Sequence, residues 1–204
     1  FSIDVEALEV DFMICSAYKF YGPHVGILYS REGLLDQLEP DRLRTQDPQA
    51  PYRIETGTLN HAAIVGVKAA IEYIAALGTG PDLRSKVVTA MQLIGEHERS
   101  LAAKLHAGLT TLRGVTVYGP PFGAQQRAPT VSFTVGSKRA EEVCTLLGER
   151  GFCTWDGHFY ALRAIEVLGL LEGGGVTRVG VSPYNTVDEV SRLLDELKQI
   201  AAGR

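Results

Sequence analysis

The sequence predicts an α/β fold followed by a smaller α+β lobe, and three observations support this prediction. Residues 12–15 form an apolar run of strand length, which is typical of a sheet covered on both faces. Ala, Val and Ile then recur at helical spacing over 60–77, and the pattern continues over 82–112. Strand and helix patterns alternate from residue 115 onward. We therefore predict a first domain over 1–80 and a second over 81–204.

The first domain is expected to carry a polar turn between two short strands. A short amphipathic segment around Val5 and Leu8 precedes them. In chain order, the elements that follow are a strand (12–15), the polar turn (16–23), a strand (25–29), a surface loop (39–53) and a helix (60–77). The loop is predicted from its Pro, Gln and Asp content and its lack of periodicity.

The second domain begins after Gly78 and the pair Gly80-Pro81, which separate the two long helices because glycine and proline end helical segments. The elements expected in this domain are helices over 82–112, 138–150, 160–170 and 187–202, and strands over 115–118, 130–135, 152–155 and 176–181. Together they predict a compact α+β lobe.

Composition limits the classes of function. The 204 residues carry a formal net charge of -4 without a long run of like charge, so nucleic acid is not an expected partner. No apolar stretch is long enough to span a membrane and no signal-peptide pattern is present, so the expected compartment is the cytosol. The histidines show no metal-ligand spacing, and we predict no metal site. Because the chain starts without Met and soon enters a strand, we expect a fragment.

The segment over 16–23 carries the most informative chemistry in the sequence. Lys19 directly follows an apolar strand, where burial and neighbouring cations favour a neutral amine that attacks carbonyl carbon. Position alone favours a solvated lysine at the end of a strand.

Ser16-Ala17-Tyr18-Lys19-Phe20-Tyr21-Gly22-Pro23, followed by Val25-Gly26-Ile27-Leu28-Tyr29, resembles the cofactor-lysine segment of class V aminotransferases and cysteine desulfurases. The resemblance implies that Lys19 holds pyridoxal 5'-phosphate as a Schiff base and later moves the substrate α-proton. It also implies phosphate contacts from Ser16 and Tyr18, where Tyr18 replaces a histidine common in desulfurases. Residues 1–80 would then end a large cofactor domain with a mixed, mainly parallel sheet, and 81–204 would form the α+β small domain.

A second motif is the string Arg53-Ile54-Glu55-Thr56-Gly57-Thr58. The residues alone indicate an N-terminal capping segment for the helix that starts at Asn60. It is similar to the family's Glu-x-Gly-Thr motif, which implies that Gly57 and Thr58 contact cofactor phosphate in the opposite subunit. The resemblance therefore implies a homodimer with shared active sites.

A third motif places Arg178 on the strand over 176–181, six residues before Tyr184-Asn185-Thr186. An arginine binds a carboxylate through two parallel hydrogen bonds, although an arginine on a strand also commonly forms a surface ion pair. The spacing resembles the family pattern in which this arginine binds the carboxylate of a small amino-acid substrate.

The resemblance departs from desulfurases in the segment Trp155-Asp156-Gly157-His158-Phe159-Tyr160. Tyr160 stands where the resemblance places a nucleophilic cysteine, and a phenol cannot form a persulfide. The string is similar to that of the cysteine desulfurase-like branch, in which His158 is a candidate acid or base for a bound substrate. Cys15, Cys144 and Cys153 are expected to be buried structural thiols.

The expected site is incomplete, because neither a carboxylate for the pyridine nitrogen nor a ring-stacking group can be placed in these residues. The resemblance puts those groups in a preceding segment of the same polypeptide. We predict a cysteine desulfurase-like, pyridoxal 5'-phosphate-dependent transferase or lyase. Two alternatives stay open: an aminotransferase or epimerase without desulfurase activity, and an inactive structural fragment.

Overall fold

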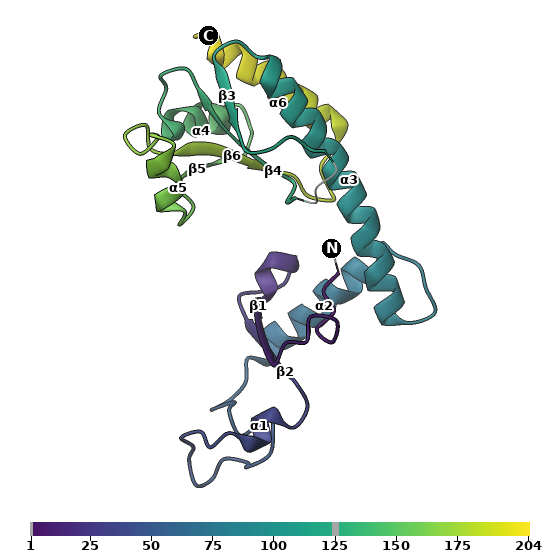
Figure 1. Cartoon of the computed structure of the whole chain (residues 1–204). Helices are drawn as coiled ribbons and strands as arrows, with labels where there is room; N and C mark the ends of the chain where they lie inside the picture. The colour runs from purple at the N-terminus through teal and green to yellow at the C-terminus, as the bar shows by residue number, and fades with distance from the viewer. Residues whose placement is uncertain (1, 124–126) are drawn as a thin grey trace. The chain divides into compact units, whose positions relative to one another are not determined.

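The computed structural model describes residues 2–123 and 127–204, and the chain divides into two compact units (Figure 1). The first unit ends at Leu93 and the second runs from Ile94 to Arg204. The division falls inside helix α3 (Leu83–Thr111), whose two parts belong to different units. The boundary expected between residues 80 and 81 precedes this helix, and it stays a prediction for the domains of a longer polypeptide.

The first unit contains the two predicted strands and the first long helix. Its elements are β1 (Phe12–Ser16), the 3-10 helix η1 (Ala17–Phe20), β2 (Gly26–Ser30), α1 (Leu34–Gln37), α2 (His61–Ala76) and the start of α3. Strand β1 pairs antiparallel with β2, from Phe12 opposite Ser30 to Ser16 opposite Gly26. Residues 5–9 form turns rather than a helix.

The sheet of the first unit is exposed, which corrects the expectation of cover on both faces. Ile14 is 78% exposed, and Phe12 and Leu28 are each 44% exposed. Only β2 pairs with β1 among the described strands, and helix α2 contacts the η1 turn. The apolar run therefore indicated the strand correctly, and the described residues leave that strand uncovered.

Helices α2 and α3 begin and end close to their predicted limits because local signals define them. Asn60 caps α2 by accepting a hydrogen bond from the backbone N–H of Ala63 at 3.0 Å. At Gly78, a Cβ atom would lie 2.0 Å from the carbonyl oxygen of Lys86. A residue without a side chain is needed there because α3 passes so close to the end of α2.

The second unit is an α+β lobe, as predicted. It contains the rest of α3, β3 (Val115–Tyr118), β4 (Thr130–Val135), α4 (Ala140–Glu149), β5 (Trp155–Gly157), α5 (Leu162–Val167), β6 (Val176–Gly180) and α6 (Val187–Ala201). The strands form one antiparallel sheet in the order β3-β4-β6-β5. Figure 1 shows α3 and α6 side by side, and Gly108 of α3 approaches Leu194 of α6.

One face of this sheet forms the core and the other positions the candidate site. Along β4, Val131, Phe133 and Val135 are buried and pack with apolar residues of α3, α4 and α6, while the alternate residues are half-buried. In β6, Thr177 and Val179 face the same core, so Arg178 points to the opposite face. The alternation of the strands thus decides where Arg178 can act.

The architecture confirms the predicted α/β class. The described strands pair only antiparallel. The mainly parallel sheet expected of a large domain stays a prediction for a longer polypeptide.

Candidate active site

Lys19 lies on a turn whose backbone is held firmly. Ala17 is fully buried, and its N–H donates to the carbonyl oxygen of Val25 at 3.0 Å. The N–H of Gly22 donates to the carbonyl oxygen of Ala17 at 2.9 Å and closes the turn. Tyr21 has a positive φ of 69° at the end of η1. The backbone therefore fixes where the lysine leaves the chain.

The surroundings of the Lys19 side chain differ from the expectation. Lys19 is exposed in the described chain, so the burial expected to favour a neutral amine is absent there. Its Nζ lies 5.8 Å from the ring centroid of Tyr18, and that ring stacks on His24 at 4.6 Å. The amine is exposed because it extends from the end of a two-stranded sheet that little else covers.

The groups at this turn fit the reactive end and the phosphate of pyridoxal 5'-phosphate. Lys19 supplies a primary amine, which reacts with an aldehyde. The half-buried Ser16 side chain makes no cap hydrogen bond to η1, so its hydroxyl is available to a phosphate oxygen. Tyr18 adds a second hydroxyl two residues along the chain. Amine and hydroxyls thus share one short turn.

Gly57 and Thr58 are exposed, and they precede the cap of α2. Gly57 has a φ of +71°, and no atom lies within 4 Å of the position that a Cβ would take. The backbone at Gly57 is therefore open to a close approach by a ligand. Asn60 caps the helix, so the hydroxyl of Thr58 is not used for capping.

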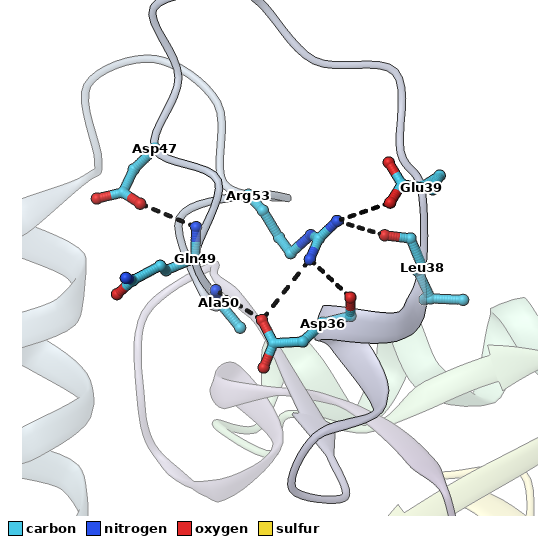
Figure 2. Close-up of polar contacts among 7 residues, drawn as sticks. All are labelled: Asp36, Leu38, Glu39, Asp47, Gln49, Ala50 and Arg53. Atoms are coloured by element: carbon cyan, nitrogen blue, oxygen red, sulfur yellow. Dashed lines mark hydrogen bonds and ion pairs between the residues drawn. The ribbon is translucent and has the colours of Figure 1, made fainter.

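Arg53 organises the loop that leads to Gly57 (Figure 2). Its side chain is only 8% exposed and donates to the carbonyl oxygens of Asp36 at 2.9 Å and Leu38 at 2.6 Å. The guanidinium also lies 3.7 Å from the Asp36 carboxylate and 3.8 Å from that of Glu39. Sequence reasoning gave Arg53 no role, because an arginine in a polar loop carries no signal that it is buried.

Arg178 lies in the sheet between Ser132 of β4 and Trp155 of β5. It is half-buried, and its guanidinium carbon lies 3.8 Å from the ring centroid of Phe159. No carboxylate within 2–123 and 127–204 forms an ion pair with it. The guanidinium is therefore able to bind an external carboxylate through its N–H groups.

The segment after β5 carries the two other predicted residues. The backbone N–H of Tyr160 donates to Nδ1 of His158 at 3.2 Å, and the two rings lie edge to face at 6.5 Å. Tyr160 is fully exposed, and both Phe159 and Tyr160 have positive φ values. The structure therefore brings His158, Tyr160 and Arg178 into one region of the second unit. Phe159, which lies between His158 and Tyr160 in the chain, makes the contact with Arg178.

The cysteines differ from the expectation of buried thiols. Cys15 and Cys153 are exposed. Cys153 precedes β5, because β5 begins at Trp155 rather than at the expected residue 152. Cys144 is half-buried and accepts a hydrogen bond from the Thr154 hydroxyl at 3.2 Å. Burial raises the pKa of the Cys144 thiol above its ordinary value.

A cavity of about 330 Å³ in the second unit is lined by residues of α3, β6 and α6 and of the loops beside them. Its lining includes Cys153, Tyr184 and Arg192, but none of the residues predicted for the site. Among the described residues, no cluster of His, Cys, Asp or Glu could hold a metal ion. None of the described helices is long and apolar enough to cross a bilayer.

The sequence profile of the family described as aminotransferase class-V matches residues 1–193. This chain belongs to that family. The cysteine desulfurase of Escherichia coli (strain K12 / DH10B) is 31% identical over 211 residues, which cover 97% of this chain and 47% of the relative. The chain thus spans about half the length of the curated relatives it matches.

Solved structures of this family share the fold. The apo cysteine desulfurase of Thermococcus onnurineus NA1 superposes with a TM-score of 0.81 at 27% identity, covering 98% of this chain and 49% of that one. The cysteine desulfurase CsdA of Escherichia coli gives a TM-score of 0.75 at 26% identity, covering 100% of this chain and 49% of that one. The likeness extends over both units of the class-V chain.

Proposed function

We propose that this class-V chain supplies the cofactor lysine and the carboxylate-binding arginine of a pyridoxal 5'-phosphate-dependent enzyme that acts on a small amino acid, as cysteine desulfurases do. The observation that carries the proposal is Lys19, on a backbone-fixed turn that directly follows Ser16 at the end of β1, in a chain that the family profile matches over residues 1–193. The motif around Lys19 also resembles the cofactor-lysine segment of this family.

Each residue has a distinct task in this proposal. The Nζ atom of Lys19 would hold the cofactor through its aldehyde group, with release of water, and as a free amine it would accept the substrate α-proton. The hydroxyls of Ser16 and Tyr18 donate to phosphate oxygens. The guanidinium of Arg178 binds the substrate carboxylate through two N–H donors. When bound, pyridoxal 5'-phosphate supplies an electron-withdrawing ring that stabilises negative charge at the substrate α-carbon.

We further propose that a preceding segment of the same polypeptide completes the site. The chain covers 47% of the Escherichia coli cysteine desulfurase, so the remaining groups have a place in a protein of that length. The exposed apolar side chains of β1 are consistent with cover from such a segment. We also propose a homodimer in which Gly57 and Thr58 contact phosphate across the interface.

A second candidate function is amino-group transfer or epimerisation without desulfuration. Tyr160 favours it, because a fully exposed phenol occupies the place where the resemblance requires a persulfide-forming thiol. Assay of the complete polypeptide with L-cysteine and a panel of other amino acids separates the two functions. Sulfide released in the presence of a thiol reductant, with L-alanine as the second product, supports desulfuration, whereas keto-acid or inverted amino-acid products without sulfide support the second candidate. The cytosolic location stays a prediction, which cell fractionation tests.

Borohydride trapping on the complete polypeptide tests the role of Lys19. We expect a yellow protein that bleaches on reduction and carries a pyridoxyl group on Lys19, located by peptide mass spectrometry. Lys19→Ala should abolish that adduct without unfolding the protein. Lys198→Ala is the matched control, because Lys198 is also exposed, and this variant should keep the adduct. A colourless protein, or an adduct confined to another lysine, would contradict the proposal.

A further inference from the structure

A strained segment places an aromatic ring against Arg178. Phe159 has a φ of 50° and Tyr160 a φ of 61°, values that bulky residues rarely adopt. Glycine would take this backbone at less cost, yet an aromatic residue stands at both positions. The Phe159 side chain is the one that contacts Arg178, since their separation is 3.8 Å from guanidinium carbon to ring centroid.

The segment is held in this conformation from two sides. His158 accepts hydrogen bonds from the N–H of Tyr160 at Nδ1 (3.2 Å) and from that of Ala161 at its carbonyl oxygen (2.8 Å). On the other side, a Cβ at Gly175 would lie 2.2 Å from the carbonyl oxygen of Gly157, so the two backbones are in close contact. The backbone that carries Phe159 is therefore held on both sides, and this directs its side chain toward Arg178.

The contact restricts how the guanidinium of Arg178 can point. At 3.8 Å the ring lies at stacking distance from the guanidinium carbon, and an arginine stacks on an aromatic ring through its flat side. The N–H donors lie in the plane of the guanidinium, so a ring on its flat side leaves them free. Trp155, the sheet neighbour of Arg178, flanks the same site and is 69% exposed.

We propose that Phe159 is a positioning residue that fixes the guanidinium plane of Arg178 for the substrate carboxylate. The inference rests on the proposed function, in which Arg178 binds that carboxylate. A guanidinium already held in one plane loses less rotational freedom when it forms two parallel hydrogen bonds. Phe159 thus raises affinity for substrates that carry a carboxylate without touching them.

The test compares L-alanine with ethylamine, which lacks only the carboxylate, as ligands of the complete cofactor-loaded polypeptide. Dissociation constants come from calorimetric or absorbance titration. Phe159→Leu should weaken L-alanine binding about three- to thirtyfold and leave ethylamine binding unchanged, because an apolar side chain is kept while the ring is lost. Phe159→Tyr keeps the ring and should restore L-alanine affinity. Both replacements keep a Cβ, so the strain at φ 50° is unchanged.

Arg178→Gln separates failure of the inference from failure of the proposed function, because glutamine is polar but carries no charge. If Arg178→Gln removes the preference for L-alanine while Phe159→Leu keeps it, the carboxylate role stands and the positioning role is overturned. If the unaltered protein shows no preference, or Arg178→Gln keeps it, the carboxylate role fails and the inference fails with it. Equal loss for both ligands in Phe159→Leu, with a lowered thermal midpoint, would show a structural role and overturn the inference.

Discussion

Glu189 couples the start of helix α6 to pH through a single side chain. Its carboxylate accepts a hydrogen bond from the backbone N–H of Thr186 at 2.8 Å, and the Thr186 hydroxyl accepts from the N–H of Glu189 at 3.2 Å. The hydrogen bond from the Thr186 backbone, followed by one from the Asn185 side chain, lowers the pKa of Glu189 below its ordinary value. The folded state therefore stabilises the ionised Glu189 carboxylate relative to its protonated form.

The lowered pKa of Glu189 determines the direction in which stability changes with pH. Because folding lowers the pKa of Glu189, its stabilisation is complete above the unfolded-state pKa and is lost as pH falls through the folded-state pKa. We predict that Glu189→Gln lowers the thermal midpoint at neutral pH and that the difference from the unaltered protein disappears in acid. Glu172→Gln, at an exposed site without a capping bond, is the control. A difference that persists unchanged in acid would refute the prediction.

Single residues also show where sequence reasoning stops. Lys19 and Arg178 were predicted as candidates because each lies in a sequence motif that resembles a segment of a known family. Arg53 and Phe159 were not, because the role of each depends on contacts across many residues. A polar loop and an aromatic after a turn are common patterns, so only the folded geometry distinguishes these two side chains.

At the level of elements, the turn between α2 and α3 depends on Gly78. A Cβ there would meet the carbonyl oxygen of Lys86 at 2.0 Å and the amide nitrogen of Ala90 at 2.6 Å, both backbone atoms that cannot move alone. We predict that Gly78→Ala lowers the free energy of unfolding by about 1–3 kcal/mol, measured by denaturant titration.

Gly95 provides the matched control within the same pair of helices. It lies inside α3, and no atom stands within 4 Å of its would-be Cβ. Gly95→Ala should therefore raise the free energy of unfolding by up to about 1 kcal/mol, because alanine favours a helix interior. If both substitutions change stability in the same direction, the close contact at Gly78 is not what holds the turn.

Elements with strong local signals were predicted closely. The helices expected over 60–77 and 82–112 occupy His61–Ala76 and Leu83–Thr111, and β3 and β4 match their predicted limits. The strand expected over 152–155 instead forms at Trp155–Gly157, because pairing with Val176–Arg178 decides which residues join the sheet. The limits of a strand that depend on such long-range pairing cannot be predicted from the local propensity of its residues.

At the scale of the whole molecule, β1 combines a buried-strand sequence with exposed side chains. Ile14 is 78% exposed, although its neighbours are apolar at every position of the run. Such a run is typical of a strand covered on both faces, and the matched relatives are about twice as long as this chain. These facts agree if the preceding segment of the proposed polypeptide packs on β1.

Substitution of Ile14 in the complete polypeptide tests that arrangement. If the preceding segment covers β1, Ile14→Val should lower the free energy of unfolding by about 1 kcal/mol and Ile14→Asp by on the order of 4 kcal/mol, because a methylene and a buried charge carry different costs. If Ile14 stays in water, both variants should lie within about 0.5 kcal/mol of the parent protein. Denaturant titration distinguishes the two outcomes. If both variants unfold with nearly the free energy of the parent protein, the preceding segment does not pack on β1.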